Sequence, residues 1–324
     1  MISTFHFNQN TRVLILAMRI SPKNIIHLQT LKGYGNVAVR AVITEMAKLA
    51  TIDDNGLYEL LEHMVMQKKL KTKVPSWDEF AKAGEHAENV IEFSSSLGIS
   101  MLTCYDDKFP MLFSTTVNAD GRSNVPLLIH YRGNIDVCDR SGLAVIGTRE
   151  PTPSGMQASE YFAAEFASKG INIISGLALG CDTAAHRGAL KVGGSTTAIL
   201  AGGLDSVYPK ENLSLSERIL ESGGLLMSEN PIGTTTNKYN LVSRDRLQAG
   251  LANATLVIQT SINGGTMHAA KSTLASRKPL WVVEYKDTSD AKIQGNLLLK
   301  EMGAETMTSS VLRNNPQYFL DKLK

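Results

Sequence analysis

The sequence predicts an α/β protein with a Rossmann-like, doubly wound, mostly parallel sheet, preceded by a small all-helical domain. From residue 143 onward, short apolar runs alternate with segments of helical periodicity, and glycine, serine or polar residues bound each run. Residues before about 95 show helical patterns instead. Strands that are apolar along their whole length indicate a parallel sheet covered by helices on both faces.

Six apolar runs are expected to be strands, and five segments between them to be helices. The strands are expected at 143–146, 171–174, 197–200, 225–227, 256–258 and 280–283. The helices are expected at 155–168, 182–191, 213–222, 240–252 and 265–276. Ser214 and Glu217 form a capping-box pattern at the start of the third helix. In such a sheet, ligands bind beyond the carboxyl ends of the strands.

The first 95 residues are expected to form a helical domain of the helix–hairpin–helix or SAM-like type, and residues 96–324 the Rossmann-like domain. Ser21-Pro22 predicts a helix start that runs to Leu31. The turn Gly33-Tyr34-Gly35 then leads into a helix whose apolar face runs from Val39 to Leu49. Such a turn can present amides to a nucleic-acid phosphate, although most helix pairs of this kind are merely packed together.

A basic run follows in the same predicted domain. It consists of Lys68, Lys69, Lys71 and Lys73. A run of like charges is usually a solvated face, and that is the simplest interpretation here.

Composition excludes several classes of protein. The net charge is +2 over 324 residues, so any polyanion site must be a local patch. Cys104, Cys138 and Cys181 lack metal-binding or disulfide-framework spacing, so no metal is expected. A signal pattern and an apolar run of about 18 residues are both missing, so we expect a cytoplasmic protein without a membrane segment.

Glycine and polar residues follow four of the predicted strands, at the edge where the strands end. Glycines between a strand and a helix let backbone amides approach an anion, and the helix dipole favours negative charge there. We therefore predict an anion site, although a tight strand–helix turn of any α/β protein would look similar. The residues are Gly147, Thr148 and Arg149, Ser175 and Gly176, Gly202 and Gly203, and Asn263, Gly264, Gly265 and Thr266. Arg149, Arg187, Arg244 and Arg246 could supply positive charge.

Two common nucleotide motifs are missing. No GxGxxG with a later acidic residue supports dinucleotide binding, and no GxxxxGK[ST] supports ATP hydrolysis. No cofactor is therefore expected.

Four ordered segments resemble the DprA/Smf family, bacterial DNA-processing proteins that bind single-stranded DNA and help to load a RecA-type recombinase. The resemblance covers roughly residues 95–300 and implies a homodimer. It rests on the segments Ala144–Pro153, Ser175–Leu190, Gly203–Asn212 and Ser243–Leu251.

The resemblance implies nucleic-acid contact at Arg149, at the Ser175–Gly176 turn, and at Arg244 and Arg246. Arg187 is equally compatible with a phosphate contact and with a surface ion pair. Together with the turns at the sheet edge, the predicted nucleic-acid-binding set is Gly147, Thr148, Arg149, Ser175, Gly176, Arg187, Arg244, Arg246, Gly264, Gly265 and Thr266. No catalytic residue is expected.

Asp182 and His186 also match family positions, and structural roles are favoured for both. Asp182 is suited to cap the helix that follows the second strand. His186 is more often a packed, hydrogen-bonded histidine than a base.

The chain departs from the family pattern in three places. Leu179 stands where the family usually has Lys or Arg, which removes one expected contact with the DNA backbone. Asn263–Ala270 replaces a more Ser-Gly-Ser-like turn. A short helical tail is expected instead of the winged-helix domain that some members carry. Roles in DNA uptake, natural transformation, recombination or phage defence stay open.

The first functional hypothesis is a non-catalytic protein that binds single-stranded DNA. Only Tyr208 and Tyr239 lie near the predicted edge as aromatic residues that bases could stack on. We therefore expect binding through the phosphate backbone, with little sequence preference and strong salt dependence.

Two alternatives use the same pocket. Gly264-Gly265-Thr266 resembles part of a signature of nucleoside-monophosphate hydrolases, but the next helix supplies no carboxylate to act as a base, and only Glu229 and Asp205 remain in turns. The other alternative is a sensor that binds a nucleotide and signals to a partner, for instance in phage defence.

Overall fold

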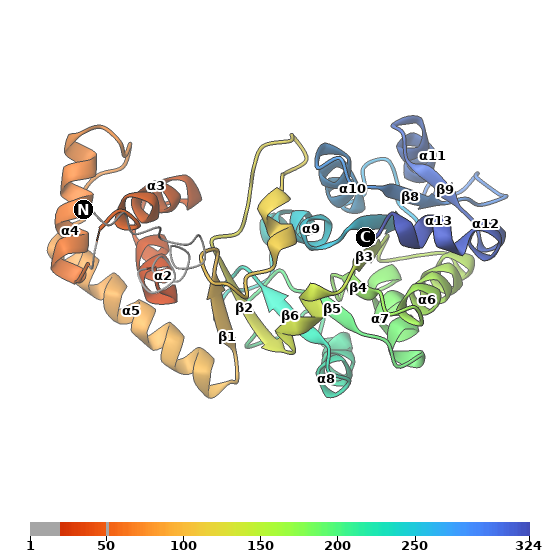
Figure 1. Cartoon of the computed structure of the whole chain (residues 1–324), viewed down its shortest axis with the longest axis horizontal. Coiled ribbons are helices and arrows are strands. Elements are labelled where there is room, and N and C mark those ends of the chain that lie inside the picture. Colours follow the sequence, from red (N-terminus) through yellow and green to blue (C-terminus); the bar gives the residue numbers. More distant parts are fainter. Residues whose placement is uncertain (1–19, 50–51) are drawn as a thin grey trace, which may run out of the picture. The chain divides into compact units, whose positions relative to one another are not determined.

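The computed structural model describes residues 20–49 and 52–324, and these divide into two compact units. The first unit extends to Phe109 and includes Pro126–Ile129, and the second comprises Pro110–Val125 and His130–Lys324 (Figure 1). The predicted helical domain of residues 1–95 falls in the first unit, and its residues 1–19 and 50–51 lie outside the described ranges. Its boundary near residue 95 stays a prediction.

The first unit is mainly helical. Its elements are α2 (Pro22–Thr30), α3 (Asn36–Met46), α4 (Asp54–Met66), α5 (Trp77–Ser96) and β1 (Ser100–Thr103). Ser21 caps α2 by accepting a hydrogen bond from the amide of Asn24, as the sequence predicts. Ser76 and Glu79 form a capping box at the start of α5. The two helices flanking Gly33-Tyr34-Gly35 are therefore present as expected.

The second unit contains the predicted sheet, and the Rossmann-like fold class is confirmed. Its strands are β2 (Leu128–Gly133), β3 (Gly142–Ile146), β4 (Asn172–Ser175), β5 (Thr196–Ile199), β6 (Leu225–Ser228), β7 (Ala254–Val257), β8 (Leu280–Val283) and β9 (Glu305–Met307). They run in the order β2-β6-β5-β4-β3-β7-β8-β9. The strands from β6 to β9 are parallel, and β2 pairs with β6 antiparallel.

The strand order reverses between β3 and β7. The chain builds outward from β3 through β4 and β5 to β6, then returns and places β7 on the other side of β3. Such a reversal is the topological switch point of a doubly wound sheet, where the loops after the two strands separate and leave room for a ligand.

Helices cover both faces of this sheet. They are α6 (Pro153–Ala167), α7 (Cys181–Lys191), α8 (Leu213–Glu221), α9 (Lys238–Leu251), α10 (Thr266–Ala275), α11 (Gln294–Glu301), α12 (Ser309–Asn314) and α13 (Pro316–Asp321). Three 3-10 turns, η1 (Met111–Thr115), η2 (Ile135–Asp139) and η3 (Lys210–Asn212), complete the elements. In Figure 1, α9 and α10 lie on one side of the sheet, and α6, α7 and α8 on the other.

The core on the α6 and α7 side is aromatic. Phe166 stacks on Trp281 with ring centroids 6.0 Å apart, and Phe319 of α13 packs edge-on against the same indole. Leu143 and Val145 of β3 belong to this core and are fully buried. Alternate residues of one central strand thus face this layer, as a sheet covered on both faces requires.

Two capping expectations are wrong. Gly180, with φ +80°, is the N-cap of α7, and Asp182 lies one residue inside the helix. The start of α8 is set by η3, which continues directly into it, so Asn212 is the N-cap and its side chain forms no capping hydrogen bond. In both cases, a preceding turn fixes the first helical residue before a side chain can cap it.

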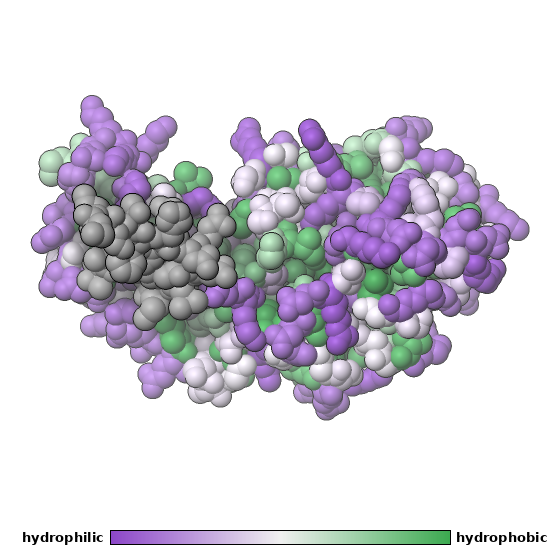
Figure 2. Space-filling view, viewed as in Figure 1, coloured by the Kyte–Doolittle hydropathy of each residue, from purple (hydrophilic) through white to green (hydrophobic). Residues whose placement is uncertain are grey.

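The length and hydropathy of a helix decide whether it can span a membrane. No helix within the described ranges is both long and apolar enough to cross a membrane. The face shown in Figure 2 is mostly hydrophilic, with hydrophobic residues visible between the polar ones.

Candidate nucleic-acid interface

A cleft of about 630 Å³ opens at the switch point. Three stretches of chain line most of it: residues 146–150 from the end of β3, residues 236–248 from just before α9 through most of that helix, and residues 260–269 after β7 and into α10. A smaller recess, which includes Gly176 and Leu179, shares Arg149, Tyr208 and Arg244 with the cleft. The edge of the sheet at which the sequence predicts an anion site is therefore concave.

The loop after β3 is held tightly and presents one free cation. A Cβ at Gly147 would lie 2.5 Å from Cys181 Sγ, so a side chain there would clash with the start of α7. The amide of Thr148 donates to the Gln259 carbonyl at 2.7 Å. Arg149 is exposed in the cleft and forms no hydrogen bond or ion pair with any residue of the described ranges. Its guanidinium is thus available to an anion.

The turn after β4 makes room for Arg244, but the Ser175 hydroxyl and the Gly176 amide already donate hydrogen bonds within the protein. Ser175 is fully buried, and its hydroxyl donates to the Val145 carbonyl at 2.7 Å. The amide of Gly176 donates to Asp182 Oδ2 at 3.1 Å. A Cβ at Gly176 would lie 1.9 Å from Arg244 Nη1, so the glycine makes room for that guanidinium. The structure does not bring Ser175 into the cleft.

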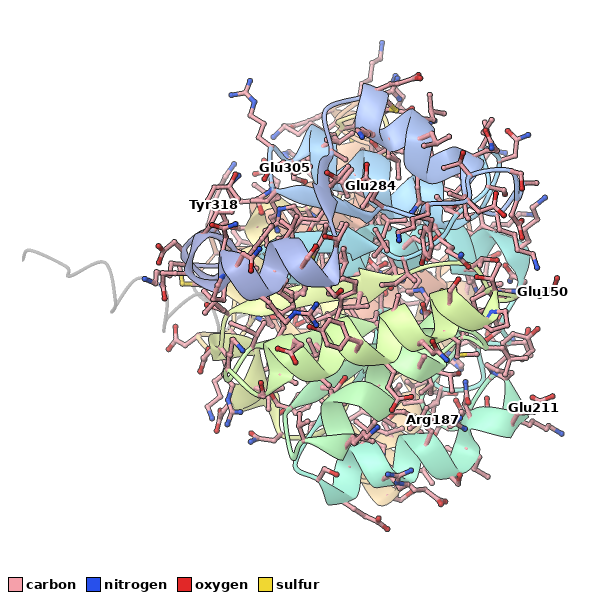
Figure 3. The ribbon with its side chains drawn as sticks, turned by 90° about the vertical axis from the view of Figure 1, so that its right-hand side faces the viewer. Glu150, Arg187, Glu211, Glu284, Glu305 and Tyr318 are labelled. Atoms are coloured by element: carbon pink, nitrogen blue, oxygen red, sulfur yellow. The ribbon has the colours of Figure 1, made fainter. Side chains whose placement is uncertain are left out.

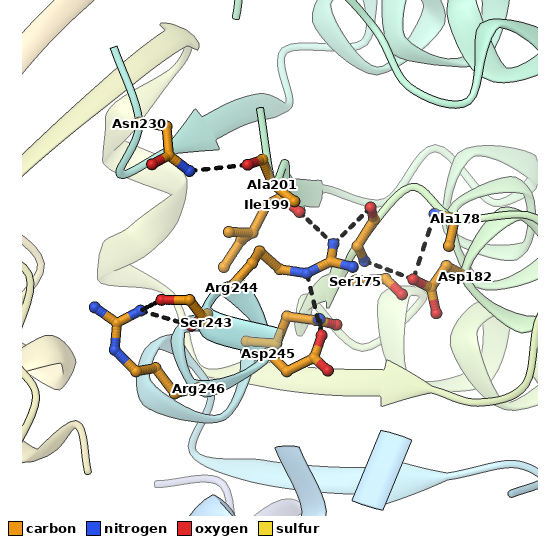
Figure 4. A network of polar contacts seen from close by, with 12 residues as sticks. Ser175, Ala178, Asp182, Ile199, Ala201, Asn230, Ser243, Arg244, Asp245 and Arg246 are labelled. Carbon is orange, nitrogen blue, oxygen red and sulfur yellow. Dashed lines mark hydrogen bonds and ion pairs between the residues drawn. The ribbon is translucent and has the colours of Figure 1, made fainter. Parts of the chain in front are cut away.

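Arg244 lies at the floor of the cleft and holds α9 to the sheet. It is 5% exposed, and its Nη1 donates to the carbonyls of Gly176 and Ile199 at 2.6 and 2.5 Å. Its Nε donates to Asp245 Oδ1 at 3.2 Å (Figure 4). Arg244 therefore adds positive charge to the cleft while satisfying carbonyls at the ends of β4 and β5.

Arg246 does not line the cleft. Its Nη2 donates to both carboxylate oxygens of Glu229 at 2.8 and 2.6 Å. Its other nitrogens donate to the carbonyls of Ser243 and Asn124 at 2.6 and 3.1 Å, and the residue is 4% exposed. All three guanidinium nitrogens of Arg246 are bonded to the protein, so none is left to donate to a phosphate. Arg246 therefore has the contacts of an arginine that stabilises the fold.

Arg187 is also outside the cleft. It lies exposed on α7, and Figure 3 shows it well apart from Glu150, which lines the cleft. Five residues separate it from Asp182 on the helix, about 1.4 turns, so it points away from the cleft that Asp182 lines.

The loop after β7 completes the predicted site. Gly264, Gly265 and Thr266 all line the cleft, where α10 begins. Gly265 caps the helix without a side-chain hydrogen bond, and the amides of Gly265 and Thr266 form none within the described part of the chain. Free amides at a helix start attract negative charge.

Sequence reasoning missed several residues of the cleft. Lys238 opens α9 as an exposed cation, and His268 lines the opposite wall. Gln248 is buried, donates to Asp245 Oδ1 at 3.1 Å, and has no partner for Oε1 in the described ranges. Lys238 stands at a helix start with no glycine or motif to mark it, so only the fold reveals it. Gln248 lies within the Ser243–Leu251 segment and His268 lies just after the Gly264–Thr266 turn, so the sequence carried a signal for both.

Two carboxylates lie at the cleft floor. Burial raises the pKa of Asp182, whose Oδ2 accepts from the amides of Gly176 and Ala178 at 3.1 and 3.4 Å. Burial also raises the pKa of Asp245 to about 6; Arg244 opposes this rise, and the Asp182 charge adds to it. The charge of the cleft therefore changes with pH near neutrality.

His186 is a packed, hydrogen-bonded histidine, which is the role that the sequence analysis favours over that of a base. It is fully buried, its Nδ1 is 2.7 Å from Thr196 Oγ1, and burial and Arg244 lower its pKa to about 3. It is neutral at physiological pH. Within residues 20–49 and 52–324, no group of three His, Cys, Asp or Glu side chains is placed to hold a metal.

A Rossmann-like sheet with an amide- and arginine-lined cleft at its switch point defines a class of α/β proteins that bind their ligands beyond the carboxyl ends of the strands. The family model of DNA recombination-mediator protein A matches residues 100–313. The chain belongs to this family, and the DprA/Smf resemblance is confirmed.

Several relatives support the assignment. A putative DNA processing protein DprA from Mycobacterium tuberculosis is 32% identical over 231 residues, covering 69% of this chain and 59% of the relative. Protein Smf from Escherichia coli is 30% identical over 174 residues, covering 54% of this chain and 45% of the relative. The chain thus matches about half the length of these curated relatives.

Two solved structures share the fold. DNA processing protein A from Streptococcus pneumoniae superposes with a TM-score of 0.74 at 24% identity, covering 90% of this chain and 96% of that one. The Helicobacter pylori protein, whose single-stranded DNA binding mode has been described structurally, gives 0.59 at 27% identity and covers 69% and 96%.

Proposed function

We propose that this chain is a DNA-processing protein that binds single-stranded DNA through its phosphates in the cleft at the switch point. The unpaired guanidinium of Arg149 in that cleft carries the proposal. The description of the Helicobacter pylori relative as a single-stranded DNA-binding protein supports it.

In this proposal, different residues around the cleft make different contacts with the DNA phosphates. Arg149 and Lys238 neutralise phosphate from two walls, and the amides of Gly265 and Thr266 donate from a third direction. Arg244 contributes charge from the floor while its hydrogen bonds fix the position of α9. A single strand can follow such a groove without being read base by base.

Base contacts are secondary in this proposal. Tyr208 is 53% exposed and lines the cleft, so one base can stack there, while Tyr239 is 80% exposed on the first turn of α9. Leu179, 41% exposed, gives the recess an apolar rim where the family usually carries a cation.

The proposal extends to a cytoplasmic, non-catalytic role, with a RecA-type recombinase and a second copy of the chain as partners, as the family resemblance implies. The relatives favour DNA over the nucleotide-sensor and hydrolase alternatives.

The test is the binding of a fluorescent oligo-dT to the full chain, followed by anisotropy at two salt concentrations. Arg149→Ala should weaken binding by about tenfold, as expected for losing a phosphate contact. Arg187→Ala is the matched control, because it removes the same charge from outside the cleft. Equal effects of the two variants, or no binding at low salt, would reject the proposal.

A further inference from the structure

A basic surface forms on the first unit from two segments that are distant in the sequence. Residues 31–35 connect α2 to α3, and residues 67–75 connect α4 to α5. The two connections lie side by side: a Cβ at Gly33 would be 2.7 Å from Thr72 Oγ1, and the Tyr34 hydroxyl donates to the Lys73 carbonyl at 3.2 Å. We call the exposed Lys32, Lys68, Lys71 and Lys73 of these connections the lysine surface.

The second connection is anchored at three points. Leu70 is 5% exposed and packs into the core of the unit. The Lys69 amide donates to the Met64 carbonyl at 2.9 Å, and the Tyr58 hydroxyl donates to the Pro75 carbonyl at 2.9 Å. The backbone that carries the lysines is therefore held in place, which lowers the entropic cost of binding a ligand there.

The lysine surface has little negative charge to neutralise it. The side-chain ammonium groups of its four lysines form no hydrogen bond or ion pair with residues of the described ranges. Beside it, Lys48 and Lys69 share the single carboxylate of Glu45, at 2.8 and 3.7 Å.

The nearest acidic residues at the start of α5 are already engaged. Asp78 pairs with Lys82 at 2.8 Å, and Glu79 accepts from the Ser76 amide and hydroxyl at 2.8 and 3.0 Å. The hydrogen bonds from Ser76 lower the pKa of the Glu79 carboxyl group, and the charge of Lys32 adds a smaller lowering. The surface as a whole keeps an excess of positive charge although the net charge of the chain is only +2.

We propose that the lysine surface is a second DNA-binding surface, which contacts the phosphates of duplex DNA independently of the cleft. Ammonium groups on flexible stems recognise phosphates as point charges and do not read bases. Duplex DNA presents the denser array of phosphates, about one per 1.7 Å of its axis, and so matches several neighbouring cations best. The family match begins at residue 100, so it does not include the helices and connections that carry this surface.

The test uses the full chain and two triple variants with the same change in charge. Lys32→Gln, Lys71→Gln and Lys73→Gln remove part of the lysine surface. Lys169→Gln, Lys191→Gln and Lys300→Gln are the control, because these lysines pair with Glu165, Glu160 and Glu284 on the second unit. Binding of a short blunt duplex and of oligo-dT is measured across a series of salt concentrations.

The lysine-surface variant should bind the duplex about tenfold more weakly at low salt. The slope of log affinity against log salt should become less negative by about 2 to 3, because each lost phosphate contact contributes about 0.9 to that slope. Binding of oligo-dT should change by less than about twofold, and the control variant should resemble the original protein. All substituted lysines are exposed, so the Tm should not move.

Three results would overturn the proposal: no duplex binding by the original protein at low salt, equal losses in both triple variants, or a loss confined to oligo-dT. Arg149→Ala separates this surface from the cleft. If that substitution leaves oligo-dT binding unchanged while the lysine variant loses the duplex, the cleft proposal fails and the lysine surface stands.

Discussion

At the scale of single residues, three arginines near the cleft act differently because their guanidinium groups have different numbers of unpaired donors. Arg149 has all its donors available, Arg244 uses part of its fork on backbone carbonyls, and Arg246 is fully bonded to protein. Only an arginine with unpaired donors can add a hydrogen bond to a ligand without first breaking one.

Arg246→Leu should therefore destabilise the fold more than it alters the cleft. It would leave Glu229, 16% exposed, without its partner, and breaking such a pair costs on the order of 3–5 kcal/mol. Chemical denaturation measures this loss. Adding Glu229→Leu should recover part of it, because the uncompensated charge is then gone, and a fully stable Arg246→Leu protein would contradict this role.

Asp245 should make DNA binding depend on pH. Its pKa is raised to about 6, so the carboxylate is charged above pH 6, where it repels phosphate, and neutral below it. Affinity for oligo-dT should rise as the pH falls from 7.5 to 5.5, a range set by that pKa.

Asp245→Asn is the discriminating variant for this effect. Asp182, Glu150, Arg149, Arg244, Lys238 and His268 also line the cleft. In Asp245→Asn these groups remain, so the pH dependence that survives belongs to them. An unchanged pH profile would show that Asp245 does not control the affinity.

At the scale of elements, α9 is the helix that positions the cleft, and both its middle and its C-terminal end are fixed. Arg244 ties its middle to β4 and β5. Near its end, Lys278 Nζ donates to the carbonyls of Ala249, Gly250 and Ala252 at 3.1, 2.7 and 2.8 Å. The last carbonyls of a helix lack helical partners, and a lysine here satisfies them and faces the negative end of the dipole.

Lys278→Met should cost about 1–3 kcal/mol of stability, because buried carbonyls would lose their donor. The Tm and denaturant midpoint measure it, with Lys271→Met as the control on the exposed face of α10. Equal stability of the two variants would contradict the role of Lys278 as the donor that holds the end of α9.

The same lysine predicts a pH effect on stability. Burial lowers the pKa of Lys278 to about 8 from 10.5, so the unfolded chain binds more protons than the folded one between these values. The contribution of this group to the free energy of unfolding should rise from pH 8 to pH 10.5 and be missing in Lys278→Met.

At the scale of the whole molecule, a net charge of +2 means that attraction to DNA arises from local clusters. The cleft offers Arg149, Lys238 and Arg244, opposed by Glu150, Asp182 and Asp245. Such a mixed site binds few phosphates at a time.

The salt dependence of oligo-dT binding should consequently be shallow for a DNA-binding protein, which revises the strong dependence expected from the sequence alone. With two or three phosphate contacts on a single strand, the slope of log affinity against log salt should lie between about −1 and −2. A slope steeper than about −4 would mean that phosphates are bound well beyond the cleft.

The sequence by itself determined the sheet and predicted a candidate site at the carboxyl ends of its strands. Apolar runs mark strands because a strand buried on both faces has no polar side, and glycines mark the turns because only they allow the close approaches seen at Gly147 and Gly176. These signals are local, so they are readable without the fold.

Only the tertiary structure decided which of the predicted residues have donors that are available to a ligand. The partners of Arg244 and Arg246 come from β4, β5, Asn124 and Glu229, far away in the sequence, and no local pattern reports that a donor is already occupied. The same holds for the raised pKa of Asp245 and for the lysine surface. Each depends on segments that meet only when the chain folds.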